Sequence, residues 1–99
     1  MDNLGRVGMA LQALGQLNRP NEFYEIVGQF RPLHYQALAR NSYVLFRPWM
    51  AGIRRDRRFM LLANRLGLVR YWRTSGKWPD FCADPQLTYN CKAEATKLK

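Results

Sequence analysis

Apolar residues recur at helical spacing from the start of the chain. The first stripe consists of Leu4, Val7, Leu11 and Leu14, separated by intervals of three and four residues. This period predicts a helix over about residues 2–17, capped by Asp2 or Asn3. Small residues, Gly15 among them, interleave with the stripe, so we expect a second helix to approach this one closely.

Asparagine and proline mark the boundaries of the next elements. Asn18 suits the left-handed position after a helix, and Pro20 cannot continue one. We therefore expect a second helix over about residues 21–30, with Asn21 as its cap. A third helix is expected from about residue 33, and a short one after residue 47 with Pro48 in its first turn.

The C-terminal half contains two more helical patterns. Asp56 is a suitable N-cap for a helix over residues 57–66, and Gly67 is suited to the left-handed position at its end. A short helix over residues 68–74 should follow, with Leu68, Tyr71 and Trp72 on its packing side. Several prolines and turn-forming residues then predict an irregular tail, whose last eight residues either form a frayed helix or hang free.

These patterns predict an all-α fold. No stretch alternates apolar and polar residues over the length of a strand, and no Asn-Gly or Asp-Gly hairpin turn occurs. The length of 99 residues allows one modest core. We expect a single helical domain over residues 1–76 and a tail over residues 77–99 that folds back on it.

Composition adds a strong positive charge to this picture. The formal net charge is +9, and residues 51–99 hold eleven basic residues against four acidic ones. Such a surface attracts polyanions, although a merely solvated basic face is the more common use of such charge. The candidate polyanion-contacting residues are Arg54, Arg55, Arg57, Arg58, Arg65, Arg70 and Arg73. By helical spacing, Arg58 and Arg65 are expected to share a face, with Arg70 and Arg73 beside them.

The sequence does not indicate catalysis. The carboxylates Asp2 and Asp56 have the positions of helix caps, and Glu22 and Glu25 lie in the first turn of a helix, where the dipole favours them. The single histidine, His34, lies at a helix start, where a cap or a surface position is the expected role. We expect no enzyme activity, no cofactor and no metal site.

Cys82 and Cys91 are nine positions apart, and two free thiols are the simpler expectation for them. A disulfide between them is the alternative and would require an oxidising compartment. The first 17 residues lack the basic start and unbroken apolar stretch of a secretory signal, and no apolar run is long enough to span a membrane. We therefore expect a cytoplasmic location, or an extracytoplasmic one if the cysteines are bonded.

Three motifs occur in a characteristic order: Arg54-Arg55-Asp56-Arg57-Arg58-Phe59-Met60, Arg65-Leu66-Gly67-Leu68-Val69-Arg70-Tyr71-Trp72-Arg73, and Gly76-Lys77-Trp78-Pro79-Asp80-Phe81-Cys82. This series resembles the C-terminal ending of bacterial tetratricopeptide-repeat (TPR) proteins, over about residues 46–91. Residues 10–17 and 21–23 are similar to the helix–turn–helix centre of one repeat. Arg57 departs from the pattern, which usually has proline there.

The resemblance implies a TPR-type helical hairpin followed by short capping helices. It implies a non-catalytic protein-interaction scaffold, of the kind found behind winged-helix regulator or cyclase domains. Its structural cap would consist of Phe59, Leu66, Gly67, Tyr71, Trp72, Trp78 and Phe81. Because stacked repeats generally need three or more units, we expect a protein or peptide partner, or self-association through the helix over residues 2–17. The alternative is a basic nucleic-acid-binding module centred on residues 54–77.

Overall fold

The computed structural model describes residues 3–98, and the side chains within them from Met9 onward. It is all-helical, with no strand in this range, as the sequence predicts. The α-helices are α1 (Asn3–Gln16), α2 (Pro20–Val27), α3 (Pro32–Arg40), α4 (Ala51–Arg54), α5 (Arg58–Arg65), α6 (Leu68–Ser75) and α7 (Cys91–Thr96). Three 3₁₀ helices connect them: η1 (Ser42–Phe46), η2 (Pro48–Met50) and η3 (Asp80–Ala83).

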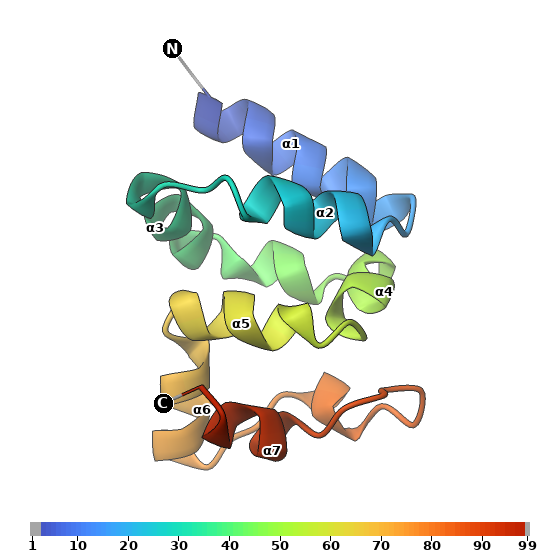
Figure 1. Cartoon of the computed structure of the whole chain (residues 1–99), viewed down its shortest axis with the longest axis vertical. Helices are drawn as coiled ribbons and strands as arrows, with labels where there is room; N and C mark the ends of the chain where they lie inside the picture. Colours follow the sequence, from blue (N-terminus) through green and yellow to red (C-terminus); the bar gives the residue numbers. More distant parts are fainter. Residues whose placement is uncertain (1–2, 99) are drawn as a thin grey trace.

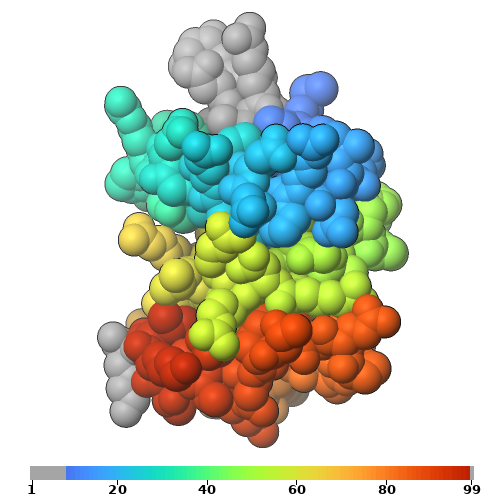
Figure 2. All heavy atoms as spheres, turned by 45° about the vertical axis from the view of Figure 1, so that its right-hand side comes forward, coloured from blue at the N-terminus to red at the C-terminus, as the bar shows by residue number. Residues whose placement is uncertain are grey.

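The helices lie in layers that follow the order of the sequence. Figure 1 shows α1 and α2 at one end of the long axis, α5 in the middle, and α6 and α7 at the other end. In the space-filling view of Figure 2 the colours form successive bands from blue to red. Neighbouring layers therefore come mainly from neighbouring parts of the chain.

The residues expected to mark helix boundaries have that role between α1 and α2, with one exception. Asn18 has a left-handed backbone with φ of 55°, as expected after a helix. Pro20 is the first residue of α2, so Arg19 takes the cap position that we expected for Asn21. Proline suits the first turn because its missing N–H needs no partner there. The expected cap at Asp2, and the side chains of Leu4 and Val7, lie outside the described residues.

Close approach between α1 and the segment around α4 depends on small residues. A Cβ atom built on Gly15 would lie 2.0 Å from the Met50 sulfur, well inside van der Waals contact. Met50 is itself buried, so the side chain has little room to withdraw. The expectation that small residues on the first helix admit a close neighbour is confirmed at Gly15.

Two tyrosines fasten α4 to distant parts of the chain. The Tyr24 hydroxyl on α2 donates a hydrogen bond to the Ile53 carbonyl at 2.8 Å, and the Tyr89 hydroxyl donates one to the Arg54 carbonyl. Burial raises the pKa of both hydroxyls, which keeps them protonated as donors. The centre of the fold is thus held by polar contacts as well as by its apolar core.

An aromatic cluster joins the C-terminal segment to α5 and α6. The ring centroids of Phe59 and Phe81 are 5.3 Å apart, and those of Trp72 and Trp78 are 6.0 Å apart. Phe46 lies against the same rings. The chain after α6 therefore returns onto the core through Trp78 and Phe81.

The two short helices expected over residues 57–66 and 68–74 form as α5 and α6, but the exposure of one residue was predicted wrongly. Gly67 has the left-handed backbone expected between α5 and α6, with φ of 82°. Val69 and Trp72 are the buried residues of α6, whereas Tyr71 is 57% exposed. The inward stripe therefore runs through positions 69 and 72, three apart, and residue 71 points about 100° away from position 72.

The segment after residue 76 is more regular than expected. It contains η3 and α7, and the Asn90 side chain caps α7 by accepting a hydrogen bond from the Ala93 N–H at 2.9 Å. Cys91 and Ala95 of α7 are buried. The expectation of irregular coil was therefore wrong for η3, whereas α7 corresponds to the helix that was one of the two alternatives for the last eight residues. Packing and capping stabilise such short helices, and periodicity alone does not reveal them.

The expectation of two free thiols was also wrong. Cys82 and Cys91 form a disulfide whose Cα atoms are 5.7 Å apart. It joins η3 to the first residue of α7. The turn through Asp84 brings the two cysteines together, and Asp84 is itself held by a hydrogen bond from the Arg55 Nε at 3.0 Å.

Candidate binding groove

Much of the basic cluster is engaged within the fold. The Arg54 guanidinium donates hydrogen bonds to the carbonyls of Leu45 and Arg47, each at 2.9 Å. Arg55 forms an ion pair with Asp84 at 3.0 Å. These two arginines therefore hold neighbouring backbone and loop segments in place, and their availability to a polyanion is reduced.

Arg58 is the most heavily bonded of the cluster. Its Nε and Nη2 donate to the two carboxylate oxygens of Asp56, at 2.9 and 2.7 Å, and Nη2 also donates to the Asn21 amide oxygen at 2.6 Å. Its guanidinium lies 4.8 Å from the centre of the Tyr24 ring. Asp56 neutralises this arginine, and the network links α5 to α2.

Asp56 has a role close to the expected one. Helix α5 begins at Arg58, and Arg57 takes the cap position assigned to Asp56. The Asp56 carboxylate nevertheless accepts a hydrogen bond from the Arg58 backbone N–H at 2.9 Å. It therefore satisfies one of the free N–H groups at the start of the helix, as a capping side chain does.

Because of the Asp56–Arg58 pair, the free energy of unfolding should depend on pH in the acidic range. Hydrogen bonding from the Arg58 side chain is the main cause that lowers the pKa of Asp56. A lowered folded-state pKa contributes stability above the unfolded value of about 3.9, and this contribution is lost as pH falls below it. Asp56→Asn should cost about 1–2 kcal/mol at pH 7. Its deficit relative to wild type should shrink in urea titrations between pH 5 and 2, and a constant deficit would contradict the assignment.

The remaining candidate arginines are dispersed. Arg57, Arg70 and Arg73 are exposed, and Arg73 donates a long hydrogen bond of 3.4 Å to the Ala95 carbonyl. The structure brings Arg58 and Arg65 together, since both line one hollow, whereas Arg70 and Arg73 lie on α6 and do not line it. The expected single face of four arginines therefore reduces to a pair.

That hollow is part of a groove between α2 and α3 on one side and α5 on the other. Its two parts have volumes of about 610 and 250 Å³ and share Phe30, Tyr35 and Arg65. The larger part also contacts Pro32, Gln36 and Ala39. The smaller part also contacts Tyr24, Val27, Gly28, Arg58, Leu61 and Leu62. Neither part is lined by a carboxylate.

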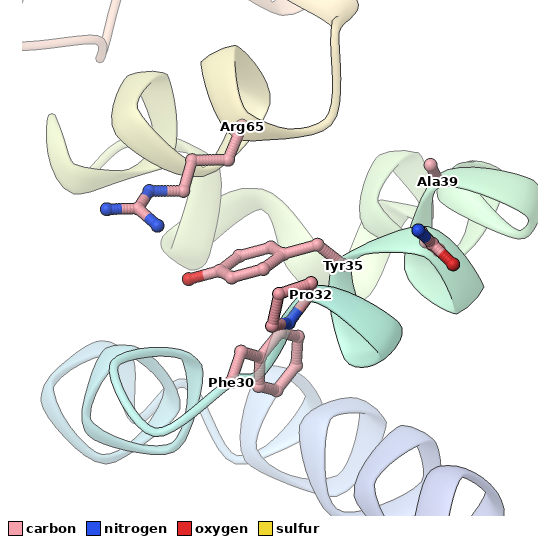
Figure 3. A pocket seen from close by; sticks show the side chains of 6 residues that line it. Phe30, Pro32, Tyr35, Ala39 and Arg65 are labelled. Atoms are coloured by element: carbon pink, nitrogen blue, oxygen red, sulfur yellow. The ribbon is translucent and has the colours of Figure 1, made fainter.

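The aromatic side chains of this binding groove support one another. Figure 3 shows the Tyr35 ring between Phe30 and Arg65. The Phe30 and Tyr35 ring centroids are 5.1 Å apart with an edge-to-face arrangement, and the Tyr35 hydroxyl donates to the Val27 carbonyl at 3.2 Å. The Arg65 guanidinium lies 5.4 Å from the Tyr35 ring centre. The two rings are therefore held in place by contacts within the fold, and the Arg65 guanidinium lies against one of them.

Sequence reasoning identified Arg58 and Arg65 but missed the aromatic side of the binding groove. Phe30 and Tyr35 fall within the two separate helices expected over residues 21–30 and from residue 33, and periodicity gives no information on how those helices face α5. A second cluster was missed in the same way: Arg47 lies 5.6 Å from the ring centres of both Tyr43 and Trp49. His34 has the expected capping role, accepting a hydrogen bond from the Arg31 N–H.

Residues 3–98 contain no group of three or more His, Cys, Asp or Glu side chains placed to hold a metal ion. Over the same range no helix has the length and apolar character needed to cross a membrane. Comparison with protein-family models, curated proteins and solved structures found no match to this chain.

Proposed function

We propose that this chain is a non-catalytic protein-interaction scaffold, the C-terminal end of a TPR-type array in a bacterial regulatory or signalling protein. The observation that carries the proposal is the outer face of α1, at one end of the stack of layers (Figure 1). Met9 on α1 and Leu17, the first residue after its end, are 74% and 65% exposed there, and Ala13 lies exposed between them. Their spacing of four residues puts them on one face of the helix.

Helix α1 therefore has apolar residues on two faces. Leu11 and Gly15 face the core, and Leu14 is partly buried against it. A helix that is apolar on more than one side is typical of an element that lies between two neighbours. In a stacked array the outer face of such a helix is covered by another repeat, and each repeat packs chiefly on the next in sequence.

The oligomeric state tests this proposal. Size-exclusion chromatography with light scattering should show self-association of the wild-type chain that persists in high salt, because apolar contact is not screened by ions. Leu17→Ser should shift the protein toward monomer. Leu33→Ser is the matched control, since Leu33 lies on α3 and is similarly exposed at 61%. A wild-type monomer at all concentrations, or equal effects of both variants, would argue against a contact face on α1.

The alternative, a nucleic-acid-binding module, has less support. Its strongest candidates, Arg54, Arg55 and Arg58, are engaged with carbonyls or carboxylates of the fold. Under that alternative, the logarithm of the affinity for DNA or RNA should fall steeply and linearly with the logarithm of the salt concentration. The affinity should also be similar for all nucleic-acid sequences. Weak or salt-insensitive binding in a filter or anisotropy assay favours the scaffold.

A further inference from the structure

We propose that the binding groove binds an acidic peptide segment of a protein partner, with a carboxylate on Arg65 and a neighbouring apolar side chain against Leu61. This inference rests on the proposed scaffold function and names the chemistry of the partner. It combines three observations: a cation without a carboxylate partner, an exposed apolar side chain beside it, and a fixed aromatic wall.

The cation is Arg65. Among residues 3–98, no Asp or Glu forms an ion pair with it, and its guanidinium lies over the Tyr35 ring. Arg58, at the other end of the smaller hollow, is already neutralised by Asp56. The binding groove therefore presents one uncompensated guanidinium, whose planar donors match a carboxylate in a two-point contact.

The apolar anchor is Leu61. It is 55% exposed although it lines the smaller hollow, and it lies three residues after Arg58 and four before Arg65 on α5. This spacing places all three side chains on one face of the helix. An apolar side chain of a partner that covered Leu61 would be brought next to the Arg65 guanidinium.

The opposite wall is aromatic and held in place. The Tyr35 hydroxyl bonds to the Val27 carbonyl, and its ring packs edge-to-face on Phe30. Tyrosine and arginine are enriched among the residues that dominate binding energy at protein interfaces. Because these side chains are held before binding, less conformational freedom is lost when a partner arrives.

A peptide suits this site better than a nucleic acid does. A polyanion backbone needs several cations in a row, and its affinity comes from the phosphates that they neutralise. The binding groove offers one uncompensated cation, while Arg70 and Arg73 lie outside its lining. A single carboxylate with apolar neighbours matches the mixture of one charge and several aromatic or aliphatic contacts.

The experiment is a selection of random 12-residue peptides displayed on phage against the immobilised full chain. Enriched peptides should contain Asp or Glu next to Phe, Leu or Trp. The affinity of synthetic versions of these peptides should be lower for Arg65→Gln than for the wild-type protein by a factor of about ten or more, because a hydrogen bond to a charged group is lost. Leu61→Ser should weaken binding several-fold, and Arg65→Lys should weaken it less than Arg65→Gln.

Matched control variants test whether peptide binding depends on the groove residues or only on the overall charge and apolar surface of the protein. Arg70→Gln makes the same charge change on the exposed part of α6, and Leu33→Ser makes the same leucine-to-serine change on α3, outside the lining of the groove. Both should leave peptide affinity within about twofold, because surface substitutions outside the contact have small effects. Circular dichroism melts confirm that each variant is folded, and replacing the peptide carboxylates by amides should reproduce the Arg65→Gln loss in the wild-type protein.

The outcomes distinguish this inference from the proposed function. Peptides whose binding depends on Leu17 but not on Arg65 would contradict peptide binding in the groove. They would remain consistent with the proposed scaffold function. Enrichment of neutral or basic peptides, or binding of an oligouridylate probe that Arg65→Gln abolishes, would overturn the acidic-peptide assignment. No enrichment from any library would overturn the inference, while the oligomeric state would still test the scaffold.

Discussion

Phe59→Ala is expected to lower the free energy of unfolding by about 3–5 kcal/mol, the usual cost of removing a fully buried phenylalanine side chain. Phe59 is fully buried and contacts Phe46 and Phe81, so its loss leaves a cavity between α5, η1 and η3. A domain of this size commonly has a total stability of only about 5–15 kcal/mol. Urea denaturation followed by circular dichroism measures the change.

Tyr71→Ala is the matched control for the aromatic cluster. Tyr71 is next to Trp72 on α6, but its side chain is exposed, so its loss should cost less than about 1 kcal/mol. Phe59→Leu keeps most of the volume and should cost about 1–2 kcal/mol, which gives a measurable value if the alanine variant does not fold. Equal midpoints for Phe59→Ala and Tyr71→Ala would show that the cluster does not hold the C-terminal segment on the core.

Loss of the Cys82–Cys91 disulfide is expected to cost about 2–3 kcal/mol, the value for closing a loop of about ten residues. The bond holds η3 against the first residue of α7, and Cys91 is buried there. Cys82→Ser/Cys91→Ser, or wild type with reductant, should therefore have a lower urea midpoint. Amide exchange should accelerate first in α7, because this helix of six residues is too short to be stable without its packing and the disulfide fixes its first residue.

A thiol titration is the direct check of the disulfide. Denatured protein that has never met a reductant should show no reactive thiol, and the reductant should have no effect on the stability of the double-serine variant. Two reactive thiols in the unreduced protein would contradict the pairing. Disulfides persist in oxidising compartments, so titration of protein taken from its native compartment also tests the expected cytoplasmic location.

The sequence allowed the helical elements and their boundary residues to be predicted where local chemistry decides them. Asn18 and Gly67 adopt the left-handed backbone, and Pro48 opens a short helix, because steric limits on these residues act within a few positions. The all-α class followed from the spacing of apolar residues over the whole chain. These features can be predicted without knowing which helices pack against one another.

The tertiary structure alone decided how the charged and aromatic residues are used. Arg54, Arg55 and Arg58 form a run in the sequence, yet the fold directs them to carbonyls, to Asp84 and to Asp56. Tyr71, expected to be packed, is exposed. A run of arginines in the sequence does not show whether the side chains contact solvent, a ligand or residues about thirty positions away. Only the packed fold shows which of these contacts each arginine makes.

The same distinction applies to the candidate site and to the end of the chain. Phe30 comes from the loop between α2 and α3, Tyr35 from α3 and Arg65 from α5, and the groove exists only because these parts of the chain meet. Helix α7 is too short to form on its own, and it is stabilised by the Asn90 cap, the buried face and the disulfide. Local steric preference and apolar periodicity are properties of the sequence by itself. Long-range pairing between distant side chains arises only when the layers are packed together.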